Sequence, residues 1–142
     1  MIMLDTNKLY KVYYAIGSEN KNIWNEQFFK GLIKEEATIF ITTKLKHEGY
    51  LIARQLKDEV EILSLYVKKK YRRKGHAKNL LKELKSLAYK KELAKIFLEV
   101  SIENYKAISL YNNYGFKEIS IRKNYYNYEG RKVDAKMLCL AL

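Results

Sequence analysis

The part of the chain that most clearly implies chemistry is a basic run, residues 68–74, in which six of seven side chains are lysine or arginine. An apolar, strand-like stretch ends at Val67 before this run, and Gly75 and Ala77 open a helix-like pattern after it. A helix N-terminus leaves backbone N–H groups unpaired and carries partial positive charge, which makes it an anion site. Small residues let a ligand approach that backbone closely. The run therefore predicts a pyrophosphate-binding site at a strand–loop–helix junction.

Glu99 is an acid in an otherwise apolar, strand-like stretch, between Leu98 and Val100. A carboxyl in such a place is unfavourable unless it lies near a cleft or has a partner. Partial burial would raise its pKa toward the range that a general base needs. The alternative is an edge carboxylate paired with a lysine, which the lysine-rich sequence makes equally reasonable. The pattern alone leaves both interpretations open.

The histidines and the single cysteine do not indicate a metal site. His76 lies in the basic loop, where we expect its backbone N–H to be used, and His47 is predicted in a surface loop far upstream. Two such distant histidines lack the spacing of metal ligands. Cys139 is interpreted as a core residue, not a nucleophile, because no histidine lies near it in sequence. One cysteine rules out an internal disulfide and favours a cytoplasmic protein.

Length and charge narrow the class of protein. The 142 residues predict one domain, residues 1–142, with a proper core. No apolar run approaches the roughly 20 residues that span a bilayer, and the first residues show no signal-peptide pattern. The net charge of +12 favours anionic partners, although much of it is also what a lysine-rich surface would give.

Periodicity predicts an α/β (α+β) domain. Two helices are expected near the N-terminus, one capped by Thr6 or Asn7 and ending near Ile16, the other from about Trp24 to Ile33. Strands are predicted at 37–43, 49–56 and 59–67, then a helix at 75–91 and a strand at 96–102. Asn104 should cap a short helix that ends at Gly115. Strands at 116–122 and 133–142 complete a mixed sheet.

These elements, in this order, resemble the GNAT acetyltransferase superfamily. Residues 72–77 match its acetyl-CoA signature, Q/R-x-x-G-x-G/A. Downstream, the series L-E-V, N, A-I, L-Y and G-F matches Leu98-Glu99-Val100, Asn104, Ala107-Ile108, Leu110-Tyr111 and Gly115-Phe116. The ending R-x-N-Y-Y…D-A-x-M matches residues 122–126 and 134–137. The resemblance runs from about Trp24 to the C-terminus and is most specific to the RimI type, the bacterial enzymes that acetylate a ribosomal protein's N-terminal alanine.

The resemblance implies a GNAT fold, with a mostly antiparallel central sheet and helices on both faces, and direct transfer from acetyl-CoA without a metal. It makes Glu99 the general base and Tyr111 the general acid that protonates the CoA thiolate. Without the L-Y-x-x-x-G-F context, one of 13 tyrosines would be read as a packing residue. Asn104 carries two expected roles, helix cap and hydrogen bond to the pantetheine arm.

The remaining expected site residues fall into two groups. The cofactor group uses main-chain atoms of the strand and loop and basic side chains on the phosphates: Leu65, Tyr66, Val67, Arg72, Arg73, Lys74, Gly75, His76, Ala77 and Lys78. Expected contacts with the acceptor come from Trp24, Tyr125 and Tyr126; as ordinary aromatic residues, the two tyrosines would only cover the core. The family's usual first strand is predicted to be missing or reduced to residues 1–4, and departures at Ile23 and Val133 bear on the acceptor side.

Three functions fit the sequence to different degrees. Acetylation of a protein N-terminus is favoured by the R-x-N-Y-Y…D-A-x-M ending, and acetylation of a small-molecule amine or a lysine is the alternative within the family. A basic, inactive RNA- or ribosome-binding module is the third, but it leaves Gly75 and Ala77 unexplained. A basic enzyme would repel a basic acceptor, so either acidic side chains lie at the acceptor mouth or the acceptor is different.

Overall fold

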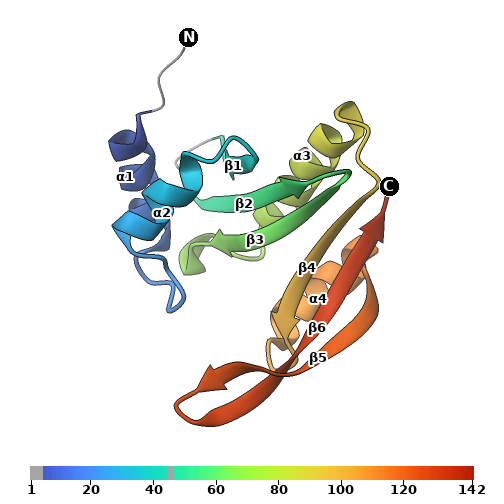
Figure 1. The fold of residues 1–142 in the computed structure, drawn as a ribbon. Coiled ribbons are helices and arrows are strands. Elements are labelled where there is room, and N and C mark those ends of the chain that lie inside the picture. The colour runs from blue at the N-terminus through green and yellow to red at the C-terminus, as the bar shows by residue number, and fades with distance from the viewer. Residues whose placement is uncertain (1–4, 45–46) are drawn as a thin grey trace.

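The computed structural model describes residues 5–44 and 47–142, and in that part of the chain a six-stranded sheet is flanked by four α-helices (Figure 1). The helices and strands follow the predicted order, and one short 3₁₀-helix, η1 (Lys69–Tyr71), is added after β3. The helices are α1 Thr6–Gly17, α2 Glu26–Ile33, α3 His76–Lys90 and α4 Tyr105–Tyr114. The strands are β1 Thr38–Thr42, β2 Gly49–Leu56, β3 Glu59–Val67, β4 Lys95–Ser101, β5 Lys117–Tyr128 and β6 Arg131–Ala141.

The sheet opens between its two central strands. Its order is β1-β2-β3-β4-β6-β5, and every neighbouring pair is antiparallel except β3 and β4, which confirms the predicted mixed, mostly antiparallel sheet. β3 and β4 pair only between residues 59–61 and 95–97. The register of β3 with β2 shifts by one residue at Leu63, and such a bulge bends the strand. Beyond it the two strands diverge, as Figure 1 shows.

The core lies in two layers, one on each face of the sheet. Alternation along β2 separates them: Tyr50 and Ile52 face α1 and α2, whereas Leu51 and Ala53 face α3 and α4. The first layer is dominated by stacked aromatic rings, and the second by leucines of α3 and aliphatic residues of β3, β4 and β6. Both faces of the sheet are therefore covered by helices, as predicted.

Several predicted boundaries change. Asp5 caps α1 in place of Thr6 or Asn7, and accepts a hydrogen bond from the Lys8 N–H at 3.0 Å. α2 begins after Asn25, so Trp24 precedes the helix. β5 extends six residues past the predicted end and forms a long hairpin with β6, because pairing resumes at Tyr126 after a bulge. The predicted remnant of a first strand, residues 1–4, lies outside the described residues.

Cys139 does not lie in the core, contrary to the prediction. Leu138 and Leu140 on either side of it point into the layer beneath α3 and α4, so Cys139 points to the other face of β6 and is half-buried as a free thiol. His47 is exposed in the loop before β2, as predicted. Among the described helices, none is long and apolar enough to cross a membrane.

Candidate active site

A cavity of about 980 Å³ lies where β3 and β4 diverge. The free end of β3, the basic loop and the start of α3 form one part of its wall, and β4, α4 and the β5–β6 hairpin form another. It brings together 14 of the 16 predicted site residues: Trp24, Leu65, Tyr66, Val67, Arg72, Arg73, Gly75, His76, Ala77, Lys78, Glu99, Asn104, Tyr111 and Tyr126. Lys74 and Tyr125 do not line it.

The basic loop presents a helix N-terminus to this cavity. Gly75 caps α3 with φ +83°, a left-handed conformation that favours glycine, and a Cβ built there would meet no atom within 4 Å. The first residues of α3, His76 and Ala77, also line the cavity. The backbone N–H groups of this first turn are therefore close to open space, as an anion site requires.

Arg72 has a structural contact in addition to its charge. Its Nε donates a hydrogen bond to the Val67 carbonyl at 2.9 Å, and its guanidinium lies 5.3 Å from the centre of the Tyr66 ring. Lys70 and Lys74 lie against the Tyr71 ring, at 5.1 and 5.8 Å. Arg72 thus fixes the loop to the end of β3, while the two lysines sit together on one aromatic ring.

Glu48, which no sequence motif marks, is a partner of the loop. Its carboxylate is largely buried and contacts His76 Nε2 at 2.6 Å, so the His76 side chain has a role beyond the backbone N–H that was predicted. The Glu48 main chain is fixed as well, because its carbonyl accepts from the Lys68 N–H and its N–H donates to Thr43 Oγ1. These contacts join the start of α3 to the β1–β2 loop, and no local pattern predicts them.

Glu99 faces the cavity and also has a basic partner. Arg122 Nη1 lies 2.7 Å from Glu99 Oε1, and the Glu99 side chain is 12% exposed against 52% for Arg122. The hydrogen bond with Glu99 raises the pKa of Tyr125, whose ring stacks under the Arg122 guanidinium at 4.3 Å. Both features proposed from the sequence thus coexist at Glu99: it borders a cleft, and it is in an ion pair, with arginine in place of lysine.

Tyr111 is buried in the wall of the same cavity. Its ring packs edge-on against Phe116, with ring centres 5.3 Å apart. A phenol is protonated at neutral pH, and burial raises the pKa of Tyr111 further above the ordinary 10. A protonated phenol that borders a cavity can donate a proton, so the geometry is compatible with a general acid.

The Asn104 side-chain amide caps α4 through its acceptor oxygen alone. Its Oδ1 accepts a hydrogen bond from the Ala107 N–H at 3.2 Å, which is the predicted helix cap. The two donors of Nδ2 are not used by this cap. Because Asn104 also lines the cavity, one side chain can serve both predicted roles.

The α1–α2 connection and the β5–β6 hairpin form the other mouth of the cavity. The Trp24 N–H donates to Tyr13 Oη at 2.9 Å, which fixes the connection to α1. The rings of Tyr126 and Tyr128 stack nearly parallel, with centres 5.8 Å apart, and burial raises the pKa of Tyr126 to about 12. Sequence reasoning missed Tyr128, together with Asn20 and Asn22 of the connection, because no motif marks them.

Within the described residues, no group of three or more histidine, cysteine, aspartate or glutamate side chains is arranged to hold a metal ion.

Comparison with known proteins gives consistent results. The sequence model of the "Acetyltransferase (GNAT) family" matches residues 5–116. The [ribosomal protein bS18]-alanine N-acetyltransferase of Escherichia coli (strain K12) is 30% identical over 140 residues, covering 98% of this chain and 95% of that protein. An N-alpha-acetyltransferase of Saccharolobus solfataricus is 31% identical over 121 residues, covering 82% of this chain and 71% of that protein.

A solved structure is similar over nearly the whole chain. The crystal structure of the ribosomal-protein-S18-alanine N-acetyltransferase from Escherichia coli superimposes with a TM-score of 0.84 at 29% identity. The match covers 99% of this chain and 91% of that one.

Proposed function

The chain belongs to the GNAT acetyltransferase family, whose members are N-acetyltransferases that use acetyl-CoA, and we propose that its acceptor is the N-terminal α-amine of a protein. The observation that carries the proposal is the single cavity that joins the anion-binding loop, Glu99, Tyr111 and an open aromatic mouth. Relatives named as alanine and α-amine acetyltransferases support an N-terminal alanine of a ribosomal protein as the acceptor.

The residues around the loop fit acetyl-CoA. The first turn of α3 offers backbone N–H groups with open space at Gly75, and Arg72, Arg73 and Lys78 bring positive charge to the same cavity. Within the part of the chain that the structure describes, the edge of β3 that faces the opening has no strand partner beyond residue 61, so main-chain groups of Leu65, Tyr66 and Val67 are available for the pantetheine amides. Acetyl-CoA supplies the activated thioester. Lys74, which lies outside the cavity, would act only through its charge.

In the proposed mechanism Glu99 accepts a proton from the acceptor's ammonium group, directly or through water, so that the amine can attack the thioester carbonyl. Main-chain N–H groups at the β3 edge would stabilise the negative charge that develops on the carbonyl oxygen. Tyr111 then donates its phenolic proton to the departing thiolate. The N–C bond forms as the C–S bond breaks. The nitrogen loses two protons in all: Glu99 takes the first and passes it to solvent, and the second, lost after attack, restores the phenolic proton that Tyr111 gave to the thiolate.

The open mouth favours a polypeptide acceptor over a small amine. The mouth lies between Trp24 of the α1–α2 connection and the stacked Tyr126 and Tyr128 of the hairpin. A small amine needs only the space around Glu99, whereas an extended chain needs an exit that is lined by groups able to contact it. The aromatic walls at this exit support a peptide.

The test compares three acceptors at equal concentration with acetyl-CoA: a peptide starting with a free alanine and containing an internal lysine, the same peptide with a blocked N-terminus, and spermidine. We expect acetylation of the first peptide only, on its α-amine, as located by fragment mass spectrometry. Glu99→Gln is the control for enzyme-dependent transfer. Acetylation of lysine in the blocked peptide, or of spermidine at a higher kcat/KM, would overturn the assignment of the acceptor.

A further inference from the structure

A line of charged residues leads away from Glu99 across the face of the sheet that carries α1 and α2. Arg122 pairs with Glu99 at 2.7 Å, and Arg54 pairs with Glu61 at 3.2 Å. The pKa of Arg122 is raised mainly by Glu99 and to a smaller extent by Glu61, so the two ion pairs are neighbours. Arg54 and Glu61 are also register partners on β2 and β3, and directly opposed residues share one face of a sheet.

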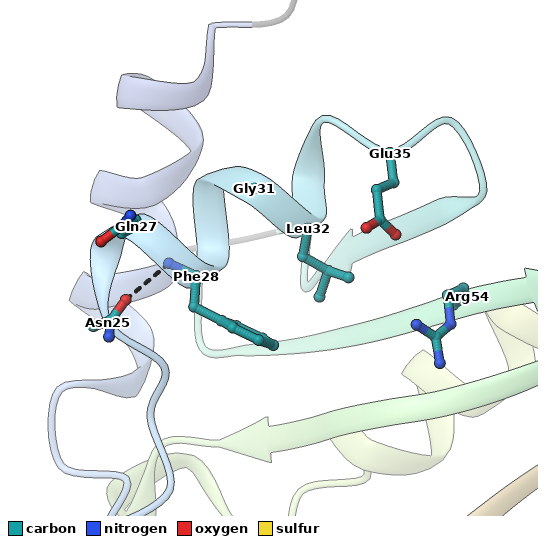
Figure 2. Close-up of a pocket in the computed structure, with 7 residues that line it drawn as sticks. All are labelled: Asn25, Gln27, Phe28, Gly31, Leu32, Glu35 and Arg54. Carbon is teal, nitrogen blue, oxygen red and sulfur yellow. Dashed lines mark hydrogen bonds between the residues drawn. The ribbon is translucent and has the colours of Figure 1, made fainter.

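This line ends at a groove of about 610 Å³ beneath α2. Figure 2 shows Phe28, Leu32 and Glu35 projecting from α2 and the turn after it toward β2, which carries Arg54. Phe28 is an exposed aromatic side chain, and Gly31 leaves the wall open, since a Cβ there would meet no atom within 4 Å. The groove therefore offers an apolar wall together with a carboxylate.

Glu35 differs from the other acids on this face. Glu61 and Glu99 are each in an ion pair with arginine, whereas no cation of the described residues lies within 4 Å of the Glu35 carboxylate. An exposed carboxylate without a partner, in a chain of net charge +12, gives this groove a negative site within a positive surface. Arg54 also lines the groove, and its guanidinium is held by Glu61.

The groove lies next to the acceptor mouth of the cavity. Trp24 lines the cavity and Phe28 lines the groove, and their rings are in contact with centres 5.3 Å apart. Arg54 lies opposite Glu61, which lies opposite Phe97 of β4, so two strand spacings and two residues along β4, roughly 12 Å in all, separate Arg54 from Glu99. An extended chain covers that span in about four residues.

We propose that this groove binds the acceptor polypeptide downstream of its reacting amine, and that Glu35 selects a lysine or arginine there. The inference rests on the proposed N-terminal acetyltransferase function and specifies the acceptor further. The cation pairs with Glu35, its aliphatic stem lies on Phe28, and Arg54 faces the main chain. A basic acceptor is thus recognised by a basic enzyme through a local carboxylate, and the overall repulsion is screened beyond about 8 Å.

The experiment uses ten-residue peptides that begin with the same Ala-starting tripeptide and carry a single lysine at one of positions 4–8, with glutamine elsewhere. We expect one position at which lysine lowers KM two- to fivefold relative to the all-glutamine peptide, which is the size of a partly exposed ion pair, with kcat unchanged. Glu35→Gln should remove this gain. The matched control, Glu36→Gln, changes an exposed neighbour that does not line the groove and should keep it.

Charge reversal separates recognition from a structural effect. Glu35→Lys should prefer glutamate at the selected position, while the free tripeptide is acetylated at the wild-type rate by all three variants. An equal KM for lysine and glutamine peptides, or a Glu35→Gln loss that also affects the tripeptide, overturns the groove assignment and leaves the proposed function standing. If neither the tripeptide nor any longer peptide is acetylated, the proposed function fails and the groove assignment fails with it.

Discussion

Replacing Tyr111 by phenylalanine tests the proposed proton donor, because only the phenolic hydroxyl is lost. The hydroxyl is removed, and the ring that packs edge-on against Phe116 at 5.3 Å remains. Since only one hydroxyl is lost, we expect the free energy of unfolding to change by less than about 1 kcal/mol. For a chain of this size that corresponds to a change in Tm of less than about 4 °C.

The expected effect on the rate is much larger. A positioned general acid contributes on the order of 10²-fold or more, so kcat should fall about 100-fold, or about 2.7 kcal/mol of transition-state stabilisation. The KM for the peptide should stay nearly constant, because the lost interaction exists mainly in the transition state. Burial raises the pKa of Tyr111 above the ordinary 10, which extends its proton-donating form to higher pH. Wild-type kcat should therefore show no loss from this group below about pH 10.

Steady-state kinetics with an Ala-starting peptide, beside a thermal melting curve, measures both effects. Tyr114→Phe is the matched control, because Tyr114 lies on the same helix and its ring also packs near Phe116, but it does not line the cavity. A Tyr111→Phe rate within twofold of wild type, or an equal loss in Tyr114→Phe, would refute the reasoning and leave protonation of the thiolate to water.

Three further predictions concern the loop and the base. Gly75→Glu should abolish acetyl-CoA binding in calorimetry because it brings a negative charge to the start of α3. Gly75→Ala has the same backbone strain at φ +83° but no charge, so it should retain most of the binding. Unchanged affinity in a folded Glu variant would contradict the anion site. Glu99→Gln should lower kcat about 100-fold with unchanged acetyl-CoA affinity. Arg122→Gln removes the same ion pair but keeps the base, so it should retain a tenth or more of the wild-type kcat. Equal losses of kcat in the two variants would reduce Glu99 to an ion-pair partner. His76→Ala leaves the buried Glu48 carboxylate without its partner and should lower the free energy of unfolding by about 2 kcal/mol. Adding Glu48→Gln to this variant should restore most of the lost stability. A wild-type melting curve for His76→Ala would show that the contact adds no stability.

Local sequence was sufficient wherever consecutive residues determine the structure. Gly75 and the leucines after it predicted the start of α3, and Asn104 and Gly115 predicted both ends of α4. Asp5, Thr6 and Asn7 are all good caps, so the start of α1 was predicted one or two residues late. Such errors are small, because the competing caps are neighbours.

Contacts between distant segments were the part that the sequence did not predict. The pair Glu48–His76 joins a loop to a helix far along the chain, and Arg122 meets Glu99 only through the register of β5, β6 and β4. β5 was predicted too short because most of its residues are exposed on both faces, so the alternation that marks a half-buried strand is absent. Tyr128 joins the site through this unpredicted extension.

The divergence of β3 and β4 has a consequence for how the protein holds together. Among the described residues, the backbone hydrogen bonds between the two halves of the sheet lie across residues 58–61 and 94–97, and alternate amides of β3 beyond that point face no strand. These amides should exchange with deuterated water more readily than those that face β2. A molecule bound along this edge would tie the two halves to each other, slow that exchange and raise the melting temperature. Occupancy of the cavity can therefore be followed by hydrogen exchange and thermal denaturation alone, before any acceptor for the acetyl group is known.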